Sequence, residues 1–160
     1  ATTVPSEVPL FVESVRRSVE GLVGKFSVHM CFPTEYQALF PHIAELPVDQ
    51  LSLELANHDG ATGGCSANSR PAYEVLTDFA RHCPEVAFGL GVVSVHEVGI
   101  ESPQLVRDRI LRAVDIVGDP VKIYPQPDCG LRTRSWAVAY DKLRTVVEGT
   151  QLAKDELGVA

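Results

Sequence analysis

The chain has 160 residues, of which 45% are hydrophobic and 22% are charged, and its formal net charge is −7. This length suits one domain with a substantial core, and the acidic balance excludes the broad positive field that nucleic acids or anionic membranes require. No apolar run is long enough to cross a bilayer, and the N-terminal stretch "ATTVPSEVPL" lacks the pattern of a secretory signal. The four cysteines are interpreted as reduced thiols, which favours a cytoplasmic protein.

Hydrophobic periodicity predicts helices that alternate with strands along the whole chain. Local signals mark several boundaries: Thr34 and Gln37 form a capping box, Gly24 can stop the first helix, and Ser102 and Ser135 are helix caps. The expected elements in chain order are helix 7–23, strand 25–31, helix 35–46, strand 51–56, helix 72–82, strand 86–96, helix 103–117, strand 121–127 and helix 136–157. Pro125 and Pro127 are expected to end the regular pairing of the last strand early.

This order predicts an α/β fold with a parallel sheet and helical crossovers. Four strands suit either a small open sheet or half of a (β/α)8 barrel. Potential ligands and catalytic groups fall at or just beyond the C-terminal ends of the predicted strands: His29, Cys31, Glu54, His96 and Cys129. Both architectures keep their chemistry at that edge of the sheet.

The stretch "SVHMC" (residues 27–31) ends a predicted strand with His29 and Cys31, whose side chains share one face because strand residues alternate. Glu54 lies in the otherwise apolar "LSLELA", where a buried carboxylate needs a partner. With Cys129, these residues offer the nitrogen, sulfur and oxygen donors that tetrahedral zinc accepts. Each also has an ordinary interpretation: a hydrogen-bonded core histidine, an arginine-paired Glu54, or a cysteine packed as a small hydrophobe.

The segments "HMC", "LELAN", "GVVSVH" and "PDCGLRTRSW" resemble, in order and approximate spacing, the C-terminal catalytic barrel of cobalamin-independent methionine synthase. The resemblance runs from about residue 9 to residue 154. It implies that the single domain, residues 1–160, is the second half of a TIM-type (β/α)8 barrel. A separate chain, self-association or an upstream segment is expected to complete it, because the family strand that ends in "IDEP" has no counterpart here.

What the resemblance implies for the site is a catalytic zinc ion bound by His29, Cys31, Glu54 and Cys129. The implied reaction is methyl transfer from 5-methyltetrahydrofolate to the thiol of homocysteine, which forms methionine. His96 lies at the position of the family's proposed proton donor, and Ser94 stands where the family usually has Asp.

Three other residues have weaker assignments. Asp128 either orients a ligand from outside the coordination shell or merely ends its strand. Arg132 and Arg134 either receive substrate carboxylates or belong to a solvated loop. Cys65 and Cys83 are expected to pack as small hydrophobes.

Other functions fit the same donor set. Related zinc enzymes alkylate a different thiol, such as coenzyme M, or take a methyl group from a corrinoid. Two further alternatives are a non-catalytic zinc-binding fragment and a metal-assisted hydrolase in which Glu54 acts as the general base. A glutamate ligand with a histidine nearby favours an open, catalytic site over a closed, structural one.

Overall fold

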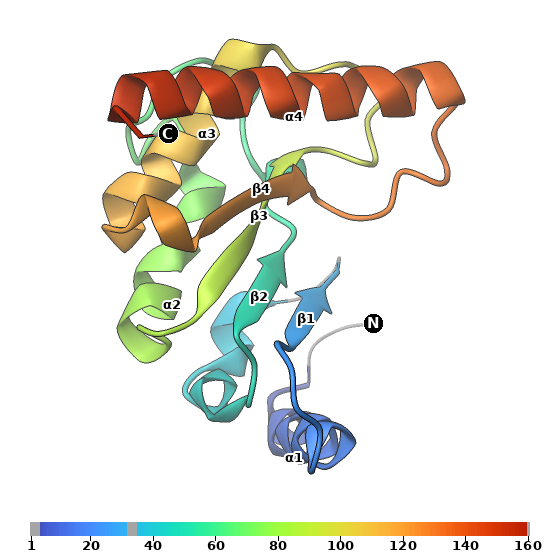
Figure 1. Cartoon of the computed structure of the whole chain (residues 1–160), viewed down its shortest axis with the longest axis vertical. Coiled ribbons are helices and arrows are strands. Elements are labelled where there is room, and N and C mark those ends of the chain that lie inside the picture. The colour runs from blue at the N-terminus through green and yellow to red at the C-terminus, as the bar shows by residue number, and fades with distance from the viewer. Residues whose placement is uncertain (1–3, 32–34, 160) are drawn as a thin grey trace.

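A parallel four-stranded sheet forms the centre of the protein in a computed structural model that describes residues 4–31 and 35–159. The elements in chain order are η1 (Pro5–Glu7), α1 (Val8–Val19), β1 (Ser27–Met30), η2 (Tyr36–Leu39), η3 (His42–Glu45), β2 (Gln50–Leu53), η4 (Ala56–His58), η5 (Pro71–Val75), α2 (Leu76–His82), β3 (Ala87–Val93), α3 (Pro103–Val117), η6 (Pro120–Lys122), β4 (Ile123–Pro127) and α4 (Trp136–Leu157), where η marks a 3-10 helix. The strands lie side by side in the order β1-β2-β3-β4 (Figure 1). Consecutive parallel strands joined by helical crossovers are the arrangement expected for part of a (β/α)8 barrel.

The two faces of the sheet differ sharply in polarity. Leu51 and Leu53 of β2 pair with Phe88 and Leu90 of β3, and all four side chains are buried against the helices. The core cluster beneath them also contains buried residues from all four α-helices, including Val12, Phe79, Ile110 and Val146. The alternate positions face the other way and carry small or polar side chains, His29, Ser52, Gly89, Tyr124 and Gln126. The apolar core therefore lies between the sheet and the helices.

The long helices begin and end where local signals predict. Ser102 caps α3 by accepting a hydrogen bond from the Leu105 amide (3.2 Å), and Gly118 ends it with a φ of 77°. Ser135 caps α4 in the same way. Glycine is favoured at such left-handed helix ends because it has no Cβ. Among the described residues, no helix is both long and apolar enough to span a membrane.

Several predicted boundaries are wrong. The expected helix 35–46 is replaced by η2 and η3, because Pro41 lies in its middle and cannot donate the helical hydrogen bond. Thr34 of the expected capping box lies outside the described residues. The first turn of helix 72–82 is the 3-10 helix η5, and α1 ends at Val19, before a left-handed Gly21 with φ 75°, well ahead of Gly24.

Strand β4 continues through Pro125 to Pro127, contrary to the expectation that these prolines end its pairing early. The Asp128 amide donates to the Val93 carbonyl (3.0 Å), and strand residues alternate in direction. The nitrogens of both prolines therefore face the outer edge of β4, where they remove no hydrogen bond to β3.

Candidate metal centre and active site

Three potential metal ligands meet at the C-terminal edge of the sheet. His29 lies in β1, Cys31 follows β1, and Cys129 lies two residues beyond β4; their ligand atoms all fall within 4.8 Å of one another. The two sulfur atoms are 3.5 Å apart. Strands β1 and β4 are the outer strands of the sheet, and neighbouring strands are about 4.8 Å apart, so a flat sheet would separate them by roughly 14 Å. The contact therefore depends on a sheet that curves toward its polar face, as in a barrel wall.

Glu54 lies beside this cluster. It immediately follows β2, and its side chain is 1% exposed. One carboxylate oxygen, Oε2, is 3.6 Å from Cys31 Sγ, and the other, Oε1, is 3.3 Å from His96 Nε2. Tyr36 holds the backbone of Glu54 in place. Its hydroxyl accepts a hydrogen bond from the Glu54 amide at 2.8 Å and donates one to the Glu54 carbonyl at 3.1 Å. The sequence predicts that a buried Glu54 needs a partner, and its carboxylate contacts the Cys31 thiol and His96.

The donor set and its spacing fit a zinc ion. Two thiolates on tetrahedral zinc, each about 2.3 Å from the metal, would hold their sulfurs about 3.8 Å apart, close to the 3.5 Å between Cys31 and Cys129. Desolvation and the neighbouring Cys129 raise the pKa of the Cys31 thiol to about 11. Without a metal, this thiol is protonated at neutral pH, so its chemistry as a ligand depends on a cation that displaces the proton.

His96 lies three residues beyond β3, and its side chain is 56% exposed. Its backbone amide donates to Ser94 Oγ (3.2 Å), and its carbonyl accepts from Arg134 Nη1 (3.3 Å). The backbone of His96 is thus held from both sides while its imidazole is half exposed to solvent. This arrangement combines a fixed position with access for an external reactant.

Asp128 supports the site through the backbone. Its Oδ1 accepts hydrogen bonds from the amides of Leu55 and Ala56, both at 2.9 Å, and its Oδ2 accepts from the Asn57 amide at 2.7 Å. Burial raises the pKa of Asp128 to about 6, against the opposing effect of these three amides. Asp128 therefore joins the segment that carries Cys129 to the turn that follows Glu54.

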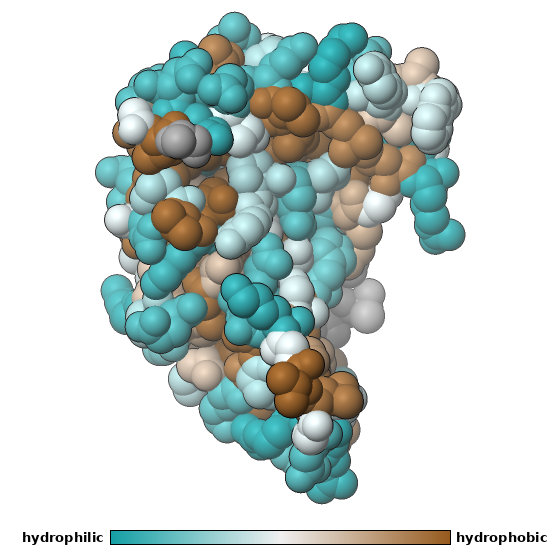
Figure 2. Space-filling view, viewed as in Figure 1, coloured by the Kyte–Doolittle hydropathy of each residue, from teal (hydrophilic) through white to brown (hydrophobic). Residues whose placement is uncertain are grey.

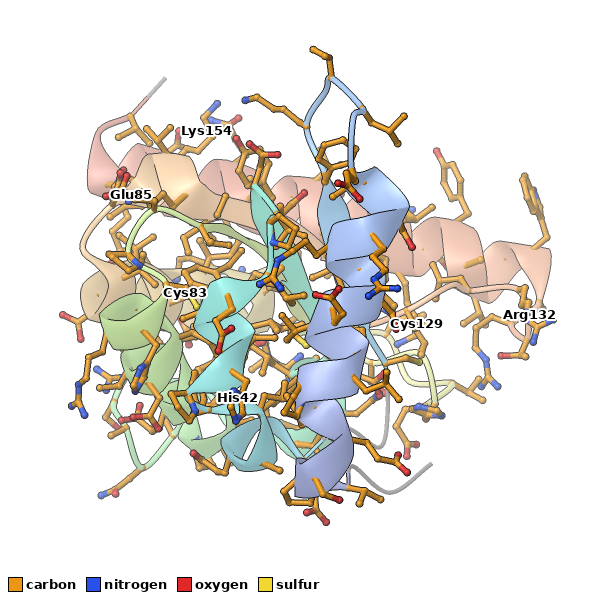
Figure 3. All side chains as sticks on the ribbon, turned by 90° about the horizontal axis from the view of Figure 1, so that it is seen from below. His42, Cys83, Glu85, Cys129, Arg132 and Lys154 are labelled. Carbon is orange, nitrogen blue, oxygen red and sulfur yellow. The ribbon has the colours of Figure 1, made fainter. Side chains whose placement is uncertain are left out.

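The remaining predicted residues fall outside the cluster. Arg132 is exposed on the loop before α4, and Figure 3 shows it well apart from Cys129. Arg134 contacts the carbonyl of His96. Cys83 is buried in the core as predicted, whereas Cys65 is exposed, so the prediction of a buried hydrophobe is wrong for that residue.

A cavity of about 300 Å³ opens on the polar face of the sheet next to the cluster. It is lined by two of the three potential ligands together with β2 and β4: His29, Ser52, Gln126, Pro127, Cys129 and Gly130. A second cavity of about 220 Å³ borders His96. Small molecules thus have space beside both the potential metal ligands and the histidine.

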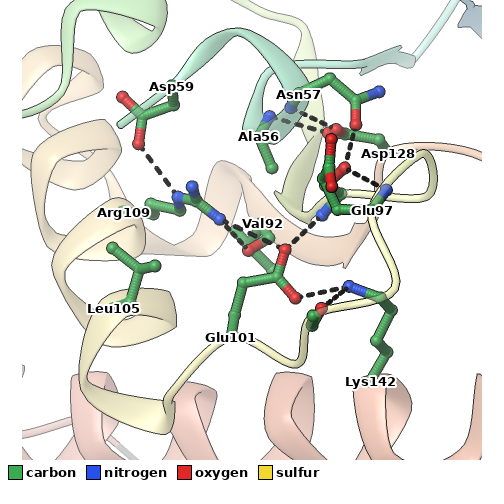
Figure 4. A network of polar contacts seen from close by, with 12 residues as sticks. Ala56, Asn57, Asp59, Val92, Glu97, Glu101, Leu105, Arg109, Asp128 and Lys142 are labelled. Atoms are coloured by element: carbon green, nitrogen blue, oxygen red, sulfur yellow. Dashed lines mark hydrogen bonds and ion pairs between the residues drawn. The ribbon is translucent and has the colours of Figure 1, made fainter. Parts of the chain in front are cut away.

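A buried polar network surrounds the site, and the sequence patterns do not predict it. Arg109, 3% exposed, donates to Asp59 (3.0 Å) and to the Val92 carbonyl (2.9 Å). Buried Lys142 of α4 donates to Glu101 Oε2 at 2.8 Å (Figure 4). These residues join the loops after β2 and β3 to α3 and α4. Local sequence does not distinguish Arg109 and Lys142 from surface charges, because the carboxylates of Asp59 and Glu101 that they contact are 50 and 41 residues away.

Asn57, three residues after Glu54, was also missed. Its amide nitrogen donates to Glu54 Oε1, and its amide oxygen accepts from Ser94 Oγ. The sequence offers one signal for this role. Asn57 is an uncharged polar residue in the turn that follows β2, and β2 leads to the candidate ligand Glu54.

Comparisons with known proteins place the chain in a family. The family described as "Cobalamin-independent synthase, Catalytic domain" matches residues 18–152. A methionine synthase of Thermoplasma acidophilum is 37% identical over 150 residues, which are 91% of this chain and 44% of that protein. A methionine synthase of Thermococcus kodakarensis is 32% identical over 153 residues, or 96% of this chain and 41% of that protein.

Among solved structures, a B12-independent methionine synthase from Shewanella sp. W3-18-1, in complex with selenomethionine, superimposes with a TM-score of 0.78 at 24% identity. The match covers 97% of this chain and 46% of that one, and it supports the partial-barrel fold. The chain thus spans less than half the length of these relatives. The match to the family over 135 residues, together with these relatives, shows that the chain belongs to the catalytic-domain family of cobalamin-independent synthases.

Proposed function

We propose that this chain is the zinc-binding half of the catalytic barrel of a methionine synthase. The reaction is transfer of the methyl group of 5-methyltetrahydrofolate to the thiol of homocysteine. The observation that carries the proposal is the meeting of His29, Cys31 and Cys129 at one sheet edge, with Glu54 and His96 in contact beside them. Membership of the family, and relatives that bear the name methionine synthase, support homocysteine as the acceptor.

The metal would be held by His29, Cys31 and Cys129, with Glu54 as the fourth ligand through the oxygen that faces Cys31. When bound, a zinc ion supplies a Lewis acid that keeps a thiol deprotonated, and therefore nucleophilic, at neutral pH. His29 and Cys31 are exposed, and one donor is a carboxylate. Structural zinc sites are usually closed and rich in thiolates, so this donor set favours a site that admits a substrate.

His96 is assigned the role of general acid. The N5 atom of a methylated folate leaves readily only when it is protonated, so the reaction needs a proton donor at the side where the folate binds. The imidazole of His96 is half exposed, and its backbone is fixed by Ser94 and Arg134. Arg132 and Arg134, on the loop after Cys129, would then receive carboxylates of the amino acid or of the folate tail.

The active unit includes a partner that completes the barrel, either a polypeptide with the preceding β/α units or a second copy of this chain. Supporting this, β1 and β4 each pair on one side only within the described residues, and the sheet curves toward its polar face. Helix α4 also exposes apolar side chains at helical spacing, Trp136, Tyr140, Leu143 and Val147, and Figure 2 shows hydrophobic surface along it. Because the chemistry requires reduced thiols, we expect the enzyme to work in the cytoplasm.

The first test is the zinc content of the purified, reduced chain. We expect about one equivalent of zinc in the wild type, its loss in Cys129→Ser, and its retention in the matched control Cys65→Ser, because Cys65 lies outside the cluster. X-ray absorption should report an additional sulfur ligand when homocysteine is added. Zinc retained by Cys129→Ser would contradict the proposed site.

The second test separates the methyl donors. The chain is combined with the first half of a related barrel and offered methylfolate or methylcobalamin. His96→Asn should keep its zinc but lose about 10²- to 10⁴-fold in the rate of transfer from methylfolate. Transfer from methylcobalamin alone, with no effect of His96→Asn, would favour the corrinoid-dependent alternative.

A further inference from the structure

We propose that Asn57 is a positioning residue that sets the Glu54 carboxylate toward the metal site, and that Ser94 in turn sets Asn57. The inference rests on the proposed function, because it takes Glu54 as a metal ligand. It concerns a side chain that donates to Glu54 and is not itself one of the three clustered ligands.

The contacts of Asn57 come from three different segments. Its amide nitrogen donates to Glu54 Oε1, its amide oxygen accepts from Ser94 Oγ after β3, and its backbone amide donates to Asp128 Oδ2 (2.7 Å) before Cys129. Figure 4 shows Asn57 beside Asp128 at one end of the polar network. A side chain held at both ends and through its backbone has little freedom to turn.

The orientation of the amide group follows from the hydrogen bonds of Ser94. Its Oγ accepts from the backbone amides of His96 (3.2 Å) and Glu97 (3.3 Å). The single hydroxyl proton is therefore left to donate to Asn57, which places the amide oxygen of Asn57 toward Ser94. The amide nitrogen then necessarily faces Glu54, whose oxygens are acceptors.

As a consequence, the two carboxylate oxygens of Glu54 have different contacts. Oε1 is engaged by the Asn57 amide and by His96, whereas Oε2 lies 3.6 Å from Cys31 Sγ. Oε2 is then the oxygen directed at Cys31, and Glu54 would bind the metal through it. Through Ser94 and Asn57, the loop that carries His96 is thus linked to Glu54 beside the cluster.

The alternative is that Asn57 only stabilises the turn after β2. The turn itself depends on backbone amides that bind Asp128, and these survive any substitution of the Asn57 side chain. A purely structural residue would therefore leave the metal site unchanged, whereas a positioning residue would alter the affinity and the ligand field of the metal.

The experiment uses zinc and cobalt(II) as probes on the full chain. Zinc affinity is measured by competition with a chromophoric chelator, and the cobalt-substituted protein is characterised by its absorption bands. The variants are Asn57→Asp, which is nearly the same size but repels Glu54, and Asn57→Ala. The matched control is Asn68→Asp, because Asn68 is exposed in the loop that follows.

We expect zinc affinity to fall about 10- to 100-fold in both Asn57 variants, with altered cobalt bands, and to be unchanged in Asn68→Asp. Ser94→Ala should have a smaller effect, and it should add little to Asn57→Asp, because it acts through Asn57. Wild-type affinity and cobalt bands in Asn57→Ala, with circular dichroism confirming the fold, would overturn the inference alone. Failure of the wild type to bind either metal would instead overturn the proposed function, and this inference with it.

Discussion

Replacing Asp128 with alanine should destabilise the fold strongly, although Asp128 is not one of the clustered ligands. Its carboxylate is fully buried and accepts hydrogen bonds from three consecutive backbone amides, those of Leu55, Ala56 and Asn57. The alanine would leave an apolar methyl group in place of the carboxylate that accepts these three hydrogen bonds. Two of the three amide contacts are buried, so water does not restore them readily.

The magnitude follows from the number of donors. Each buried amide left without an acceptor costs about 1–3 kcal/mol, which gives roughly 2–6 kcal/mol for the two buried amides and a smaller cost for the third. Removal of the buried carboxylate relieves part of its own desolvation penalty. We therefore expect a net loss of about 3 kcal/mol in the free energy of unfolding, a large share of the stability of a domain of this size.

The assay is urea-induced unfolding at about pH 7.5, above the pKa of about 6 of Asp128, so that the carboxylate is ionised. The matched control is Asp119→Ala, which removes a single hydrogen bond to a surface amide, that of Val121 (2.9 Å), and should cost about 1 kcal/mol. If Asp128→Ala lost less than 1 kcal/mol, the three amides would have found other partners, and the role assigned to Asp128 would be wrong.

Two further predictions concern stability and are measured by thermal unfolding. An alanine Cβ at Gly91 would lie 2.7 Å from a backbone oxygen of β2, so Gly91→Ala should cost about 1–3 kcal/mol, whereas Gly99→Ala, with open space around it, should be nearly neutral. Equal melting temperatures for the two variants would contradict the close packing. Glu101→Ala leaves the buried ammonium of Lys142 without its carboxylate and should cost about 3–5 kcal/mol. Glu148→Ala removes an exposed pair and should cost less than about 1 kcal/mol; a similar cost for both would refute the importance of burial.

Much of the architecture could be predicted from local patterns. Hydrophobic periodicity predicts helices that alternate with strands, and the serine caps of α3 and α4 mark where these helices begin. The C-terminal ends of parallel strands meet at one edge, which predicts that the candidate residues lie together there. The continuous helix expected over 35–46 does not form, because Pro41 in its middle outweighs the capping pattern at its start.

Residue types and their spacing along the chain thus determined the parallel α/β order, the shared face of His29 and Cys31, and the identity of the potential ligands. Only the tertiary structure decided that Cys31 and Cys129, on opposite outer strands, lie 3.5 Å apart, because that contact depends on the curvature of the whole sheet. The same holds for Asn57 and Lys142, whose polar groups meet partners from distant segments. Periodicity reports the environment within a few residues, whereas curvature and buried polar pairing arise from the packing of all four β/α units together.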